Sequence, residues 1–347
     1  MKLQSVRFFL PLITCCLGSA ALCADPEPGP YGVLTTLAVG GEGRWDYINC
    51  DSTAKLLYVP RSTHVLVLSA DDGKQVTDIP DTAGVHGVAL VPELNRGFAS
   101  DGEDGTVTVF DTKSHAVLGK VKAAADADGI IYDPASKQVL VGCGDSDVVI
   151  AIPADVDPTK GDSAAKSLDL GGKPEFIASD GAVHAFINIA NKNEVVEFDP
   201  KEMKELARWP IAPGTKPTSM AIDPAHHLLF VGCRNKLLVI LDTESGKIVS
   251  TLPIGKGVDA TAFDDGKILV SCGDGTLWVV AEESPTEFKT LQTLPTALGA
   301  RTLAVDPGTH KIYLPTADFK PADSANPKAK PEPIPDTFKI VVVGLTK

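Results

Sequence analysis

A short apolar phrase returns seven times along this chain, and this repetition constrains the fold more than any other feature. In its clearest copy, residues 218–224 read Thr-Ser-Met-Ala-Ile-Asp-Pro, and a second apolar run follows at 227–233. Two more runs follow at 236–242 and 247–255, each bounded by Asp, Pro, Gly or Asn. Runs with this punctuation are typical of short β-strands joined by turns. Four such strands in about 40 residues predict one blade of a β-propeller.

The spacing of the copies predicts seven blades. Taking the first residue of each expected inner strand as a marker, the markers follow one another at intervals of 40, 42, 47, 43, 41 and 42 residues. In chain order the markers are Asp46, His86, Asp128, Glu175, Thr218, Asp259 and Arg301. The expected fold class is therefore all-β, a single seven-bladed β-propeller over residues 25–347.

The last copy is incomplete, and the missing strand lies at the other end of the sequence. The chain stops after its expected third strand, at 339–344. Residues 33–40 match residues 248–255 in character at each position, and 248–255 form the fourth run of a complete copy. We therefore expect the N-terminal strand to complete the last blade and to close the ring. Closure removes the unpaired strand edges that promote aggregation.

Residues 1–24 are typical of a secretory signal peptide. Lys2 and Arg7 precede a short apolar run at 8–17, and small residues follow. Export to the periplasm or the cell exterior is expected, and no later segment is apolar over about 18 residues, so no transmembrane segment is expected. Cleavage would remove two positive charges and no negative ones, changing the net charge from −13 to −15. Such acidity disfavours nucleic-acid binding.

The blade phrases carry a family resemblance. Residues 57–60 read Leu-Tyr-Val-Pro and residues 107–111 read Val-Thr-Val-Phe-Asp. These phrases resemble the YVTN-repeat seven-bladed β-propeller family, in particular its YncE-like exported members, over essentially the whole mature chain. The resemblance implies the fold and export. It implies little about function, because some members bind DNA, others have no assigned activity, and a fold does not determine a function.

The markers are the candidate functional site. Strand direction places all seven at one mouth of the central channel, with Trp45 beside them, and this set of eight forms the predicted ligand-binding residues. Crowded carboxylates around an imidazole are costly unless a cation or shared protons relieve the repulsion. A divalent cation is therefore a possible cofactor, Ca²⁺, Mg²⁺, Mn²⁺ or Zn²⁺. Its possible ligands are Asp46, His86, Asp128, Glu175 and Asp259. The alternative is a water-filled polar channel without a ligand.

Three neighbouring features have two interpretations each. Arg301 pairs with Asp259 or Asp46, or grips a ligand carboxylate. Trp45 stacks on a ligand, or it packs between the first and last blades. A long loop of the last blade, 316–337, contains five prolines and is expected on the same face. It covers the channel or docks a partner, or it is a solvated loop.

The cysteines and turn histidines are expected to be structural. Three cysteines end the second strand of separate blades, too far apart for a disulfide, so free thiols are expected at Cys143, Cys233 and Cys272, and also at Cys50. The histidines at 226, 227 and 310 lie in turns on the opposite face and are interpreted as solvated turn residues.

Three functions follow from these features. The favoured one is a non-catalytic binding or scaffold propeller, a monomer that recognises a small molecule or a cell-envelope protein at the channel mouth. The alternative is a metal-dependent hydrolase of the lactonase or esterase type, with the channel carboxylates and His86 around a metal. The second alternative is nucleic-acid binding. No phosphate-binding loop, HExxH motif or nucleophile elbow occurs in the sequence, so catalysis is the less favoured class.

Overall fold

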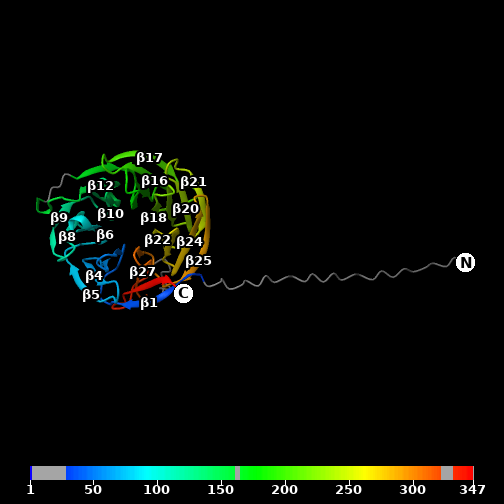
Figure 1. Ribbon diagram of the computed structural model, residues 1–347, viewed down its shortest axis with the longest axis horizontal. Coiled ribbons are helices and arrows are strands. Elements are labelled where there is room, and N and C mark those ends of the chain that lie inside the picture. The colour runs from blue at the N-terminus through cyan, green and yellow to red at the C-terminus, as the bar shows by residue number, and fades with distance from the viewer. Residues whose placement is uncertain (2–28, 161–164, 322–330, 347) are drawn as a thin grey trace.

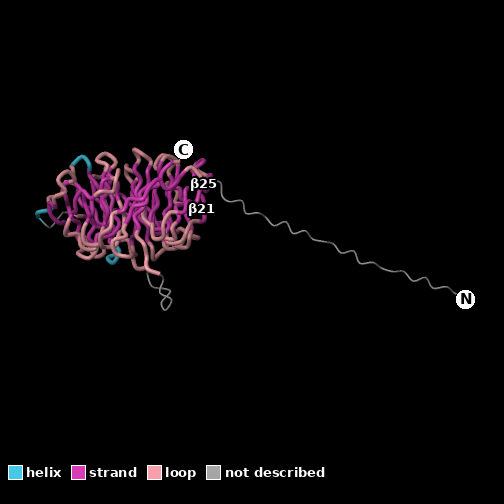
Figure 2. Tube along the Cα trace, turned by 90° about the horizontal axis from the view of Figure 1, so that it is seen from below, coloured by secondary structure: helices cyan, strands magenta, loops and turns pink. Residues whose placement is uncertain are grey.

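The structure confirms the predicted seven-bladed propeller. It is a computed structural model that describes residues 1, 29–160, 165–321 and 331–346. Seven four-stranded antiparallel sheets stand around a central channel (Figure 1). Figure 2 shows the ring from the side, with strands crossing its thickness and loops forming its two faces. The predicted signal peptide, residues 1–24, lies outside the described residues except for Met1.

The strands are numbered along the chain, and each blade begins with its inner strand. Blade 1 contains β2 (Asn49–Asp51), β3 (Leu56–Pro60), β4 (Val65–Ser69) and β5 (Gln75–Ile79). Blade 2 contains β6 (Val85–Val91), β7 (Arg96–Asp101), β8 (Thr106–Asp111) and β9 (Val117–Lys122). Blade 3 contains β10 (Ala127–Asp133), β11 (Gln138–Cys143), β12 (Val148–Pro153) and β13 (Lys166–Asp169). Blade 4 contains β14 (Pro174–Ser179), β15 (Ala185–Ile189), β16 (Glu194–Asp199) and β17 (Lys204–Pro210).

The remaining blades follow the same order. Blade 5 contains β18 (Pro217–Asp223), β19 (Leu228–Cys233), β20 (Leu237–Asp242) and β21 (Ile248–Pro253). Blade 6 contains β22 (Val258–Asp264), β23 (Lys267–Cys272), β24 (Thr276–Ser284) and β25 (Glu287–Pro295). Blade 7 contains β26 (Ala304–Asp306), β27 (Lys311–Thr316), β28 (Lys339–Leu345) and β1 (Tyr31–Ala38). Short 3-10 helices lie in connections, η1 (Pro92–Leu94), η2 (Gly144–Ser146) and η3 (Pro158–Lys160).

The N-terminal strand closes the ring, as predicted. β1 pairs antiparallel with β28, from Tyr31 opposite Leu345 to Ala38 opposite Lys339. The strand therefore begins two residues before the predicted 33 and ends two residues before the predicted 40. In Figure 1 the blue N-terminal strand lies beside the red C-terminal segment. The side chain of Gln292 on β25 also bonds the backbone N–H and carbonyl of Tyr31, at 3.0 and 2.8 Å.

The hydrophobic core is divided among the seven contacts between neighbouring blades. One cluster, for example, joins Leu57 and Leu68 of blade 1 to Tyr313 and Ile340 of blade 7. Both faces of each sheet are therefore covered, and β19 is buried at every residue. This explains the continuous apolar runs in the sequence, because a strand covered on both faces does not need to alternate with polar residues.

The cysteines in the described part of the chain, including Cys50, are free, as expected. Cys143, Cys233 and Cys272 end the equivalent strands β11, β19 and β23 and are fully buried. Burial raises the pKa of Cys143 to about 11 and that of Cys233 to about 12. Within the described residues, no helix is long and apolar enough to span a membrane.

Candidate functional site

The seven markers lie where the inner strands begin, but not at the predicted position within them. In blades 2 to 6 the marker is the second residue of the inner strand, as with His86 on β6. In blades 1 and 7 it precedes the strand by three residues, since β2 begins at Asn49 and β26 at Ala304. The register shifts directly around the marker in blades 2 to 6, as between Val85 and Val88. A β-bulge re-aims side chains and breaks the regular pairing, which explains the offset.

His86 is the centre of one network at the channel mouth. Its Nδ1 lies 2.8 Å from Asp46 Oδ2 and 3.5 Å from Asp128 Oδ1. Its Nε2 lies 3.9 Å from Asp126 Oδ1, and Asp126 in turn accepts a hydrogen bond from Lys173 at 3.0 Å. Burial alone would lower the pKa of His86, but the bond to Asp46 and the charge of Asp128 raise it to about 9. The imidazole is therefore protonated at neutral pH when the channel holds no other cation.

Asp259 is the centre of a second network, on the other side of the channel. Arg301 Nε donates to one of its carboxylate oxygens at 2.5 Å, and Arg234 donates to the other at 2.6 Å. Arg301 also lies 3.5 Å from Asp46 Oδ1, so it joins the two networks. Both predicted partners of Arg301 are therefore present, and its guanidinium is committed to protein carboxylates.

Asp128 is the least satisfied group at the channel mouth. The residue is 8% exposed, and its Oδ1 has no hydrogen-bond partner in the described part of the chain. His86 lies at ion-pair distance but directs its Nδ1–H to Asp46. Burial raises the pKa of Asp128 well above its usual range, and the charges of Asp46 and Glu175 raise it further. A buried carboxylate oxygen without a donor is unfavourable.

Thr218 is hydrogen-bonded to a neighbouring blade, whereas the Glu175 carboxylate has no partner in the described residues. Thr218 donates its hydroxyl hydrogen to the backbone carbonyl of Val258 at 2.8 Å, so it joins blades 5 and 6. Glu175 is half-buried, and over residues 29–160, 165–321 and 331–346 its carboxylate forms no hydrogen bond or ion pair. Burial raises its pKa, and the nearby charge of Asp259 contributes. Glu175 is therefore a second carboxylate with unused acceptor capacity.

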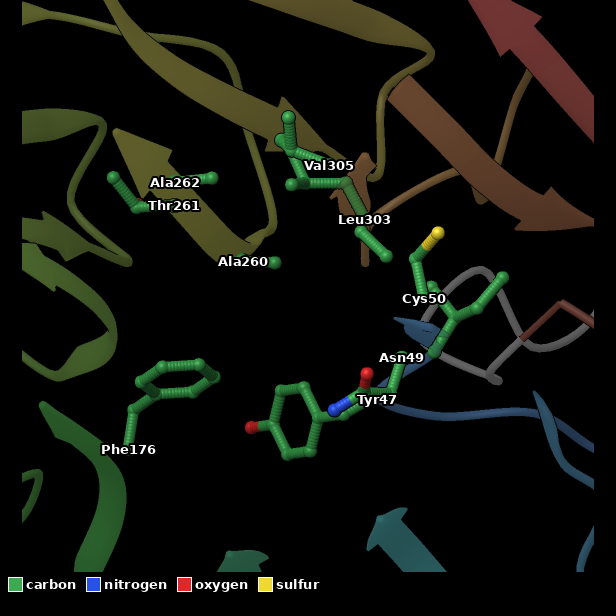
Figure 3. Close-up of a pocket in the computed structure, with 11 residues that line it drawn as sticks. Tyr47, Asn49, Cys50, Phe176, Ala260, Thr261, Ala262, Leu303 and Val305 are labelled. Atoms are coloured by element: carbon green, nitrogen blue, oxygen red, sulfur yellow. The ribbon is translucent and has the colours of Figure 1, made fainter. Parts of the chain in front are cut away.

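An aromatic pair forms the floor beneath these carboxylates. The rings of Tyr47 and Phe176 meet edge to face with centroids 5.3 Å apart. Burial raises the pKa of Tyr47 well above 10, followed by the charges of Asp128 and Asp259. In Figure 3 the two rings lie side by side and border a cavity of about 260 Å³ between the inner strands. The other lining residues are Ile48, Asn49, Cys50, Ala260, Thr261, Ala262, Leu303, Ala304 and Val305.

Trp45 packs between blades and does not face a ligand site. It is 6% exposed, and its ring lies 5.4 Å from the ring of Phe338 and 6.1 Å from that of Phe319. Phe319 belongs to the proline-rich loop, whose base is a bridge between Phe319 and Pro333. The base of this loop therefore lies beside Trp45 on the channel-mouth face, as predicted. Residues 322–330 of the loop lie outside the described residues.

The predicted metal set separates into two groups. Asp46, His86 and Asp128 offer three ligand atoms that lie within 4.8 Å of one another. Asp259 is instead bonded to two arginines, and Glu175 is not part of the group. Only the first three residues are arranged to share one cation.

Sequence reasoning missed four contributors to this site. Tyr47 and Phe176 each follow a marker directly, and the other five residues at that repeat position are small. These are Gly87, Gly129, Ser219, Ala260 and Thr302. The two aromatic side chains could have been noticed in the sequence, because the other five blades carry small residues at this repeat position. The other two contributors, Asp126 and Arg234, do not lie at the repeat position of the markers.

Comparisons with known proteins support the fold alone. No protein-family model matches the chain, and no curated protein sequence matches it. Among solved structures, it is similar to a chain in a crystal structure of the mitotic checkpoint complex, with TM-score 0.73 and 12% identity, over 100% of this chain and 99% of that one. It is also similar to a chain of Kuenenia stuttgartiensis hydrazine synthase, with TM-score 0.66 and 14% identity, over 87% and 98%. Membership of the YVTN-repeat family stays a prediction.

Proposed function

We propose that this chain is an exported, non-catalytic binding protein whose channel mouth takes a small ligand with an ammonium or similar cationic donor group. The observation that carries the proposal is the Asp128 carboxylate, buried at the channel mouth with one oxygen that has no hydrogen-bond partner in the described residues. The propeller fold is compatible with a binding or scaffold role. Export rests on the signal-peptide pattern of residues 1–24.

The charge balance at the mouth favours a cationic ligand over an anionic one. The basic side chains that contact the channel-mouth carboxylates are already paired, Arg301 and Arg234 with Asp259 and Lys173 with Asp126. Asp128 and Glu175 keep acceptor capacity, and burial raises the pKa of both carboxyl groups, followed by nearby carboxylate charges. A bound ammonium group would supply the missing donor.

The floor of the site suits the same ligand. An aromatic face attracts a cation within about 6 Å by roughly 0.5–2 kcal/mol. Tyr47 and Phe176 directly follow Asp46 and Glu175 in the sequence, and their two rings are in contact (Figure 3). The cavity of about 260 Å³ that these rings border is lined by neither Asp128 nor Glu175, so it does not set the size of the ligand.

A binding panel with two variants tests the proposal. Putrescine, spermidine, choline and glucosamine are titrated calorimetrically, with glucose as the uncharged comparison for glucosamine. At least one amine should bind, and Asp128→Asn should weaken it at least tenfold. Asp155→Asn, an exposed carboxylate that removes the same charge, should bind as wild type does. Binding by no amine, or equal binding by Asp128→Asn, would contradict the proposal.

A metal-dependent hydrolase is the second candidate, because Asp46, His86 and Asp128 converge within 4.8 Å. A divalent cation held there would polarise an ester carbonyl and activate water. Elemental analysis of protein purified without chelator, beside an Asp46→Ala/Asp128→Ala double variant, separates the candidates. About one equivalent more metal in the wild type than in the double variant, with hydrolysis of a lactone or ester, would favour the hydrolase. Equal metal content in the two proteins, with binding of an amine by the wild type, would favour the binding protein.

A further inference from the structure

A second cluster of metal-ligating side chains lies on the face opposite the channel mouth, between blades 5 and 6. Asp223 ends β18, whose second residue is Thr218, so Asp223 and Thr218 lie at opposite ends of one strand. His226 follows in the turn, and Glu282 comes from β24 of the next blade. His226 Nδ1 lies 2.8 Å from Asp223 Oδ2 and 2.6 Å from Glu282 Oε1. The three ligand atoms lie within 4.8 Å of one another.

Glu282 is the group that needs an explanation. Its side chain is 3% exposed, and neither carboxylate oxygen has a hydrogen-bond partner in the described ranges. The Nδ1–H of His226 is directed to Asp223, so its short distance to Glu282 is a contact without hydrogen-bond geometry. A buried carboxylate that lacks donors is strongly unfavourable unless a cation compensates it.

His310 in blade 7 is a turn histidine with a single carboxylate partner. It is bonded to Asp264 of blade 6 at 2.8 Å, and no second carboxylate contacts it in the described chain. Both His226 and His310 stay about half exposed, as predicted, and both also contact carboxylates. Of these two histidines, only His226 has two carboxylates at one ring nitrogen, and the side chain of one of them is 3% exposed.

Glu282 occupies a repeat position at which other blades carry smaller, uncharged side chains. Its backbone N–H donates to Gly266 O at 3.0 Å, and the residues that make the equivalent bond in blades 1, 2, 3 and 5 are Ala70, Thr112, Ala154 and Thr243. β24 also has nine residues, whereas the third strands of blades 1 to 5 have five or six. Blade 6 therefore carries a carboxylate where these four blades carry none.

We propose that Asp223, His226 and Glu282 bind one divalent transition-metal ion, Zn²⁺ by ligand type, and so link blades 5 and 6. One imidazole and two carboxylates suit zinc, whose bonds to nitrogen and oxygen are about 2.0–2.2 Å. Ligand atoms in a tetrahedral complex of this size are about 3.4 Å apart, so His226 must move outward by less than about 1 Å. Its side chain is 51% exposed and can do so.

The surroundings of the cluster fit a metal site in two further ways. The Oδ1 atom of Asp223 accepts a hydrogen bond from the backbone N–H of Ala225 at 2.9 Å, which leaves Oδ2 directed at the metal position. Such outer contacts orient the ligands of metal sites. The half-exposed His226 leaves a route to solvent, so water can fill the fourth position of the metal.

Metal titration of the full chain, purified without a histidine tag, tests the proposal. Co²⁺ is followed by its visible absorption, and Zn²⁺ by calorimetry. The wild type should bind one equivalent at this site, and Glu282→Gln and His226→Asn should each weaken it at least tenfold. His310→Asn, at another half-exposed turn histidine, should not weaken it. Asp128→Asn should not either, which separates this site from the channel mouth.

Several outcomes would overturn the proposal. The proposal fails if the wild type binds neither metal at excess. It also fails if the Glu282→Gln and His226→Asn variants bind the metal as tightly as the wild type does. Binding lost only in Asp128→Asn would assign the metal to the channel instead. If Glu282→Gln does not fold, the half-exposed His226→Asn variant decides the question. Zn²⁺ should also raise the melting temperature of the wild type and not that of His226→Asn, because a ligand of the native state stabilises it.

Discussion

Asp128 and Glu282 lie on opposite faces of the propeller, and the burial of each carboxylate is poorly compensated. Each is a carboxylate in a poorly solvated position, with oxygens that have no hydrogen-bond partner in the described residues. Their surroundings differ in what could bind. Asp128 faces a channel with an aromatic floor, which suits an organic cation. Glu282 meets one imidazole and one more carboxylate at metal-ligand spacing.

Asp101 offers a test of carboxylate burial away from both sites. Its side chain is fully buried, and Oδ2 accepts hydrogen bonds from Thr106 and Thr108 while Oδ1 has no partner in the described residues. Burial raises its pKa from 3.8 to about 6. Because the folded state holds the proton more tightly, this group stabilises the fold below pH 4, and that stabilisation is lost as the pH rises through about 6.

Asp101→Asn should remove this pH dependence. The wild type should lose roughly 3 kcal/mol of unfolding free energy from this group between pH 4 and pH 7. The unfolding free energy of the variant, measured by urea unfolding at each pH, should therefore rise relative to that of the wild type between pH 4 and pH 7. Asp155→Asn, at an exposed position, serves as the control. A difference that does not vary with pH would contradict the assignment.

The residues of the site could be predicted from the sequence only where they occupy the same position in each repeat. His86 and Asp128 could be placed at the channel mouth because each occupies the same position in its blade. Arg234 could not, because it follows the second strand, and only the ring geometry brings it to Asp259. Glu282 could not be predicted either, because the equivalent positions in other blades carry uncharged residues such as Ala154 and Thr243.

At the scale of elements, β1 determines whether the ring is closed. Its loss would uncover β28, whose residues Val341, Val342 and Val343 are buried. It would also remove the buried Tyr31 and Leu37. An exposed apolar strand edge of this kind promotes association between chains.

Deletion of residues 31–38 should therefore destabilise the whole propeller. Loss of two buried side chains alone should lower the unfolding free energy by roughly 4 kcal/mol, and the product should aggregate on heating. Differential scanning calorimetry and size-exclusion chromatography measure both effects. Deletion of residues 2–24, which precede the ring, is the control and should leave the melting temperature unchanged. A synthetic peptide of residues 29–40 should restore part of the loss.

The link between β1 and β2 has its own anchor in Arg61. This residue is 2% exposed, and its guanidinium lies 3.9 Å from the ring centroid of Phe338. It donates hydrogen bonds to four successive carbonyls, those of Gly40, Gly41, Glu42 and Gly43. One planar side chain thus joins the linker and blade 1 to blade 7.

Arg61→Lys should weaken this closure although it keeps the charge. An ammonium group cannot reproduce a planar fork that serves several carbonyls and stacks on a ring. We expect a loss of about 2–3 kcal/mol in unfolding free energy, measured by urea denaturation. Arg44→Lys, at an exposed position in the same linker, should change stability by less than about 0.5 kcal/mol. Equal effects of the two substitutions would contradict the role of Arg61.

Closure itself was predictable because β1 resembles the fourth strand of the other blades. The short inner strands of blades 1 and 7 were not. β2 and β26 have three residues each, whereas the other inner strands have six or seven. Their sequences match the repeat, but pairing is set by backbone geometry, which a pattern of side-chain types does not determine.

At the scale of the molecule, the blades form a rigid ring whose charge is strongly negative. The chain has 45 acidic and 32 basic residues, a formal net charge of −13. Several basic side chains at the channel mouth are paired with carboxylates, Arg301 with Asp259 and Lys173 with Asp126. Phosphate groups would therefore meet repulsion at a distance, and these paired cations are not free to bind them.

This charge distribution gives an expectation for nucleic acids, which the family resemblance leaves open. Labelled single-stranded DNA should not bind with a Kd tighter than about 10 µM at about 0.15 M salt, measured by fluorescence anisotropy. The control is an Asp128→Asn/Glu175→Gln variant, which removes two negative charges from the channel mouth and should bind no more than weakly. Tight binding by the wild type with a steep salt dependence would show released counterions. It would mean that a local basic surface outweighs the net charge, and it would overturn the preference for a small cationic ligand.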